Sequence, residues 1–116
     1  MSGDENSFAK NTIPLLQEYS QKLVGMRNDI HNLKIQICQP PVNQPHIMEQ
    51  RAWFAKQLEA RRAAFPFLGN QFQILINLAL SEADKKVADY WLEAELRLRI
   101  ADAQHELEIT KQYVFS

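Results

Sequence analysis

Apolar positions along the first third of the chain repeat with the period of a helix that packs along one seam. They follow one another in steps of three and four residues through three consecutive heptads. The seam consists of Leu16, Tyr19, Leu23, Met26, Ile30, Leu33 and Ile37. This pattern predicts a helix over 12–38 with coiled-coil-like heptad packing. We expect Thr12 to cap this helix and Pro14 to lie in its first turn, where a proline removes no hydrogen bond.

Prolines and capping residues divide the rest of the chain. The segment QPPVNQP predicts a linker over 39–45, because Pro40 and Pro41 each remove a backbone donor and clash with a preceding helical turn. A turn is expected at FPFLG, and Ser81 is expected to cap the last helix. The helices after the linker are predicted over 46–64, 70–80 and 82–113.

The lengths of the first and last helices bear on the overall shape. The polar residues before the first helix predict a flexible tail over 1–11, which leaves 12–116 as a single helical domain. At 1.5 Å per residue the first helix would span ~40 Å and the last ~48 Å. A compact domain of this size has a radius of gyration of only ~13–14 Å. The fold class predicted is therefore all-α, an elongated bundle or long hairpin of three to four helices.

A long uncharged stretch lies in the middle of the chain. No charged residue occurs between Arg62 and Glu82, although 23% of the chain is charged. Only twelve of these nineteen residues are apolar, and Pro66 and Gly69 are among those that interrupt them. A membrane span needs ~20 predominantly apolar residues, so the sequence argues against one. Apolar residues instead surround most of the helix over 70–80, which predicts that this helix is buried in the core.

The last helix carries two apolar stripes that point in nearly opposite directions. The first consists of Leu92, Leu96, Ile100, Ala103, Leu107 and Val114. The second consists of Val87, Trp91, Ala94, Leu98 and Ala101. One stripe can pack within the chain, which would leave the other for a partner. Trp53 is likewise left for a partner, because it lies about 100° from the main apolar stripe of its own helix.

Composition and charge narrow the function classes. The chain has a formal net charge of −1, which provides no electrostatic attraction for nucleic acid or anionic lipid. A single cysteine excludes a disulfide within the chain. The polar segment SGDENS after Met1 lacks the apolar core of a secretory signal. These features predict an intracellular, cytoplasmic protein.

Residues that could carry chemistry are isolated in the sequence. His31, His46 and His105 lie far apart, and HELE at 105–108 is followed by Ile109 where a zincin would have histidine. Cys38 would act as a nucleophile only beside a basic partner that the sequence does not identify. We therefore predict no catalytic, metal-binding or cofactor-binding residue, although an enzyme that uses Cys38 stays open as an alternative.

The function predicted is a non-catalytic protein–protein interaction module, such as a scaffold, adaptor, small chaperone or complex subunit. It would bind a protein partner, or further copies of itself, by helix–helix packing. The candidate partner-binding residues are Trp53, Val87, Trp91, Leu98, Leu16, Leu23, Met26 and Ile30. The alternative is a helix-turn-helix-like DNA-binding regulator that reads adenine with Asn70, Gln73 and Asn77, although the reading helix has no basic residue for phosphate.

Overall fold

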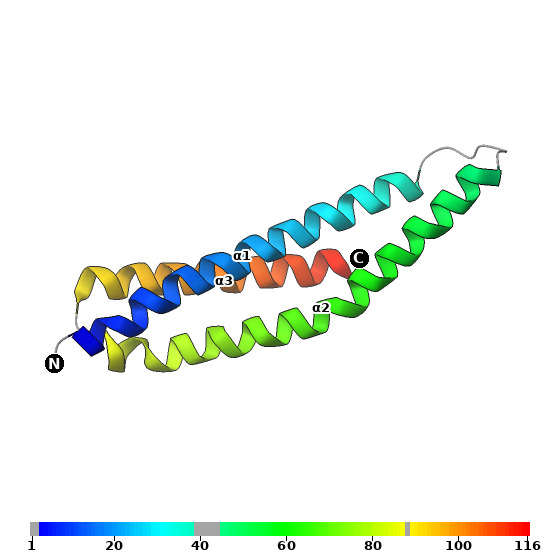
Figure 1. Ribbon diagram of the computed structural model, residues 1–116. Helices are drawn as coiled ribbons and strands as arrows, with labels where there is room; N and C mark the ends of the chain where they lie inside the picture. Colours follow the sequence, from blue (N-terminus) through cyan, green and yellow to red (C-terminus); the bar gives the residue numbers. More distant parts are fainter. Residues whose placement is uncertain (1–2, 39–44, 88) are drawn as a thin grey trace.

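The chain folds into three helices that pack side by side as an elongated bundle (Figure 1). The computed structural model describes residues 3–38, 45–87 and 89–116. The helices are α1 (Gly3–Ile37), α2 (Pro45–Lys86) and α3 (Tyr90–Val114). The prediction of an all-α, elongated helical bundle is confirmed.

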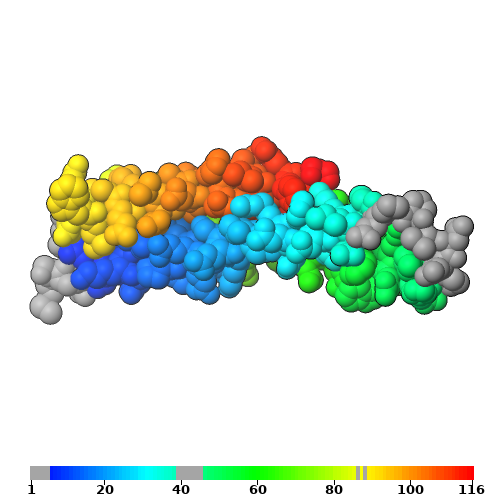
Figure 2. Space-filling model, turned by 90° about the horizontal axis from the view of Figure 1, so that it is seen from above, coloured from blue at the N-terminus to red at the C-terminus, as the bar shows by residue number. Residues whose placement is uncertain are grey.

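The bundle is a rod rather than a globule. Its principal-axis extents are 69 × 20 × 20 Å and its radius of gyration is 19.2 Å (Figure 2). α3 is the shortest of the three helices, and its C-terminal end lies partway along the other two (Figure 1). One end of the rod therefore contains α1 and α2 without α3.

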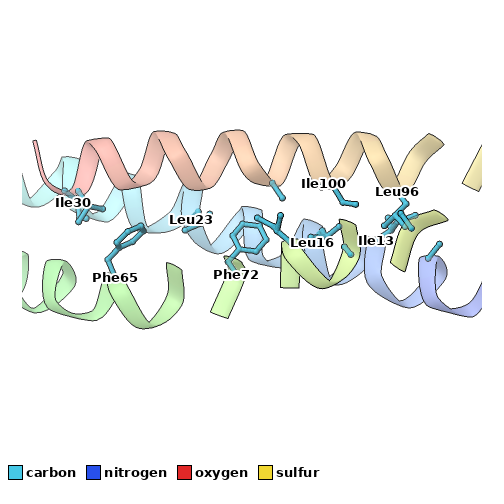
Figure 3. Packing of buried hydrophobic residues seen from close by; sticks show 14 of the residues in the cluster. Ile13, Leu16, Leu23, Ile30, Phe65, Phe72, Leu96 and Ile100 are labelled. Atoms are coloured by element: carbon cyan, nitrogen blue, oxygen red, sulfur yellow. The ribbon is translucent and has the colours of Figure 1, made fainter. Parts of the chain in front are cut away.

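The core runs along the axis where the three helices meet (Figure 3). Leu16, Leu23 and Ile30 of α1 are fully buried. On α2 the ring of Phe72 stacks on Tyr19 of α1, with ring centroids 5.3 Å apart and an interplanar angle of 17°. α3 contributes its first apolar stripe, of which Leu96, Ile100, Ala103 and Val114 are buried. Each large buried side chain stabilises the fold by roughly 1.5–3 kcal/mol.

The first helix begins earlier than predicted. α1 starts at Gly3, so the expected flexible tail is wrong for residues 3–11, and residues 1–2 lie outside the described residues. Ala9 is fully buried, and Asn6 accepts a hydrogen bond through Oδ1 from the backbone N–H of Asp89 at 3.2 Å. These tertiary contacts hold a segment whose polar composition alone does not predict a helix. Pro14 consequently lies inside the helix rather than in its first turn.

The predicted turn at residues 65–69 is absent, and α2 is one continuous helix through Pro66 and Gly69. Pro66 lacks the N–H that would bond to the carbonyl of Arg62, which costs about 3 kcal/mol in a helix interior. Phe65 and Phe72, on either side, are 4% and 0% exposed, and their burial contributes roughly 1.5–3 kcal/mol each. The packing thus offsets the proline penalty, and α2 is bent rather than broken (Figure 1).

The boundary between α2 and α3 also differs from the prediction. α2 continues to Lys86, and Ser81 is not a cap: its Oγ donates to the carbonyl of Leu78 at 3.0 Å within the helix. Asp89 caps α3 instead and accepts the backbone N–H of Leu92 at 3.0 Å. The last helix therefore begins at Tyr90 rather than at residue 82. Its predicted end at residue 113 is one residue short of the observed end.

The end of α1 agrees with the prediction within one residue. α1 ends at Ile37, Cys38 forms a turn, and α2 begins at Pro45. Residues 39–44 of the predicted linker lie outside the described residues.

Candidate partner-binding surface

An exposed apolar surface lies along α2, for the most part within its uncharged stretch. We call it the outer face of α2 and define it by ten residues, all of them exposed. They are Ala60, Ala63, Ala64, Phe67, Asn70, Gln71, Ile74, Asn77, Leu78 and Ser81. The segment 70–80, predicted to be buried in the core, is therefore buried on one side only.

Helical geometry explains how this segment can be both core and surface. Phe72, Ile76 and Ala79 are fully buried on the side of α2 that faces the bundle. Ile74 and Leu78 lie on the opposite side of the same turns and are 67% and 51% exposed. A helix with only two neighbours buries about half of its circumference, so the second apolar side of α2 faces solvent.

Trp53 extends the outer face toward the N-terminal end of α2. The positions Trp53, Ala60, Phe67 and Ile74 follow one another at seven-residue steps, and Phe67 is 75% exposed. Trp53 is 56% exposed and makes an edge-to-face contact with Phe54, with centroids 5.3 Å apart. It also lines a shallow groove between α1 and α2, beside Leu33 of α1. This is an exposed heptad stripe on α2, distinct from the buried seam of α1.

Charge is confined to the ends of this surface. The charged residues on its N-terminal side are Lys56, Glu59, Arg61 and Arg62, Glu82 borders it on the C-terminal side, and no charged residue occurs between residues 63 and 81. The polar groups within it are neutral amides and a hydroxyl, and Gln73 at its margin donates through Nε2 to Asn77 Oδ1 at 2.9 Å. Large apolar patches without charge are typical of surfaces that become covered.

An ion pair joins the C-terminal end of α2 to α3. Asp84 accepts a hydrogen bond from Arg97 Nη2, and Glu93 lies 3.4 Å from the same nitrogen. The hydrogen bond from Arg97 lowers the pKa of the Asp84 carboxyl, with smaller contributions from Glu93 and from the charge of Arg97. The same contacts raise the pKa of Arg97. The charges at this end of the outer face are thus partly neutralised within the chain.

The length and composition of α2 also bear on whether it could span a membrane. Among the described residues, the stretch His46–Lys85 is long and apolar enough to cross a membrane by length and composition alone. Core helices of soluble proteins share this length and composition. In this bundle 22% of the most apolar part of the stretch is buried.

The structure separates the candidate residues predicted from the sequence into three groups. Leu16, Leu23 and Ile30 are fully buried within the chain, so in this fold they are unavailable to a partner. Met26 and Val87 are half-buried against the same core. The exposed candidates are Trp53, Trp91 and Leu98.

α3 presents its second stripe to solvent, on the side opposite its buried residues. Trp91 and Leu98 are 79% and 56% exposed, and Ala94 and Ala101 are exposed between and beyond them. Val87 does not belong to this helix, because α3 begins at Tyr90. Glu95 and Asp102 lie on the exposed surface beside the stripe, so its apolar area is narrower than the outer face of α2.

Sequence reasoning missed Phe67, Ile74 and Leu78. The predicted turn at 65–69 divided α2 into two short helices, which concealed the seven-residue spacing that starts at Trp53. A continuous helix through Pro66 would have revealed the stripe.

In the described parts of the chain, the residues of the DNA-binding and Cys38 alternatives lie as follows. Because α2 is continuous, the turn that a helix-turn-helix motif requires is absent at 65–69. Cys38 is exposed at the end of α1. His31 lies 3.1 Å from the Tyr113 hydroxyl through Nδ1. Within the described part of the chain, no three histidine, cysteine or acidic side chains cluster as a metal site would require.

Comparisons of the chain with protein-family models, with curated proteins and with solved structures give no match. Its function is therefore inferred from the geometry described above.

Proposed function

We propose that this protein is a non-catalytic protein–protein interaction module that works through helix–helix packing, and that the outer face of α2 is its main binding surface. The observation that supports this most directly is the exposure of Phe67, Ile74 and Leu78 on one uncharged helical face. Burial of apolar area contributes about 25 cal/mol per Å², so a partner that covers these side chains gains binding energy without desolvating a charge.

The shape of the surface favours a helical partner. Its ten residues recur along α2 at steps of three and four, the spacing of a heptad, and helices that pack together bury faces of this kind. The three alanines near its N-terminal end allow close approach of another helix, while Phe67 projects as an aromatic anchor.

Site-specific photo-crosslinking tests this function. A benzophenone amino acid placed at position 67 should give discrete protein adducts in cells of the source organism. The same group at Gln104, which is exposed on α3 outside the apolar stripe, is the matched control and should give markedly fewer. Equal or absent adducts at the two positions would contradict the proposed function.

A further inference from the structure

We propose that the partner on the outer face of α2 is a second copy of this chain, with the two α2 helices antiparallel and Gly69 of each copy at the same level. This inference rests on the proposed function and specifies its partner. It is carried by the order of small and large residues along the face.

Side-chain size changes along the outer face. Ala60, Ala63 and Ala64 occupy its N-terminal part, and all three are exposed. Ile74 and Leu78 occupy its C-terminal part. The face therefore has a shallow end and a raised end.

An antiparallel pair centred on Gly69 places the raised end of one copy on the shallow end of the other. Ala60 then faces Leu78, and Ala64 faces Ile74, once on each side of a two-fold axis. Interdigitation of large and small side chains gives close packing without voids. A two-fold contact of this kind uses the same patch on both copies and closes after two chains.

Near the two-fold axis, the residues of one copy also complement those of the other. Phe67 of one copy faces Gln71 of the other, whose methylene groups offer an apolar surface to the ring. Asn70 lies beside the axis in both copies and is exposed in the single chain. Because an amide both donates and accepts, two Asn70 side chains can form reciprocal hydrogen bonds. A polar residue at such a position fixes the register of paired helices.

Charge favours the same orientation. Lys56 lies level with Glu82 of the second copy, and Trp53 lies level with Lys85, which suits a cation–π contact. In a parallel pair, Lys56 would lie beside Lys56 and the alanines beside alanines. That arrangement combines like-charge repulsion with a gap at one end.

Disulfide trapping distinguishes the two orientations. In a Cys38→Ser background, Ala64→Cys and Ile74→Cys are made as separate proteins and oxidised alone and as a mixture. In the antiparallel pair only the mixture should cross-link, because residues 64 and 74 of different copies meet. Two copies of residue 64 would lie ~15 Å apart along the axis, at 1.5 Å per residue. A disulfide requires Cα atoms within ~7 Å. Cross-linking of either protein with itself would indicate a parallel pair and overturn the inference.

Matched charge substitutions test whether the dimer forms through the outer face of α2 or through α3. Phe67 and Leu98 are 75% and 56% exposed on different helices, so Phe67→Asp and Leu98→Asp should both retain the helical circular dichroism of the parent. In sedimentation velocity, Phe67→Asp should raise the dimer dissociation constant by on the order of 100-fold, as loss of an aromatic anchor does. Leu98→Asp should leave it unchanged. The opposite result would assign the interface to α3 and overturn the inference.

Failure of this inference is distinguishable from failure of the proposed function. One chain has a mass of 13.5 kDa. A cross-linked product of twice that mass from position 67 supports a second copy as the partner. An adduct with a different protein only, together with a monomer in sedimentation, overturns the second copy but leaves the interaction module intact. Flotation of the monomer with phosphatidylcholine vesicles, abolished by Phe67→Asp, would assign the face to lipid and overturn both.

Discussion

Arg27 of α1 reaches across the bundle to Glu106 of α3, and its Nη1 lies 2.5 Å from the carboxylate Oε2. The same nitrogen donates to Thr110 Oγ1 at 2.9 Å. The Arg27 and Glu106 side chains are only 20% and 25% exposed. The contact joins residues that are 79 positions apart in the sequence and fixes the alignment of α3 on α1.

Removal of this contact should destabilise the fold. Arg27→Ala leaves the partly buried Glu106 carboxylate without its cation, and we expect a loss of about 1.5–3 kcal/mol in the free energy of unfolding measured with urea. Glu18→Ala is the control, because its ion pair with Lys22 is exposed and should contribute less than about 1 kcal/mol. Equal losses for the two variants would show that the Arg27 contact is not a structural one.

Two phenylalanines on α2 should respond oppositely to truncation. Phe72 is 0% exposed and stacks on Tyr19, so Phe72→Ala should cost about 3–5 kcal/mol through lost burial and a cavity. Phe67 is 75% exposed, and Phe67→Ala should change the free energy of unfolding by about 0.5 kcal/mol or less when measured at the lowest workable protein concentration. A large loss at Phe67 under those conditions would place its ring in the core of the single chain.

Two helical glycines should accept alanine. An added Cβ at Gly25 meets nothing within 4 Å, and at Gly69 it meets the Phe65 ring at 3.5 Å, an ordinary van der Waals distance. Each substitution should therefore stabilise the chain by about 0.5–1 kcal/mol, because alanine has the higher helix propensity. Thermal unfolding followed by circular dichroism measures this. A destabilised Gly69→Ala would mean that α2 and α3 approach too closely there for a methyl group.

The link between Asp84 and Arg97 should make a small, pH-dependent contribution to stability. The pKa of Asp84 is lowered in the folded chain, so the contribution is complete above the ordinary value of 3.8 and is lost as the pH falls through the lower folded-state pKa. A carbon-detected NMR titration should place the Asp84 midpoint below 3.8, and Arg97→Gln should return it toward that value. An identical titration curve in both proteins would contradict the contact.

The sequence predicted only part of the candidate surface. The heptad of α1 identified Leu16, Leu23 and Ile30 as seam residues, but it did not reveal that their partners lie in the same chain. The exposure of Trp91 and Leu98 agreed with the expectation of two opposed stripes on the last helix. Ile74 and Leu78 were assigned to the core, because an apolar helix of eleven residues is normally buried on all sides.

Local sequence determined the helical character of the chain, the end of α1 near Cys38, the beginning of α2 near Pro45 and the end of α3 near Tyr113. These features follow from side-chain period and from proline, which act over a few residues. Tertiary structure decided that α2 continues through Pro66, because burial of Phe65 and Phe72 offsets a local penalty. It also decided which apolar side of α2 faces solvent, because α1 and α3 cover only part of a helix whose apolar residues surround most of its circumference.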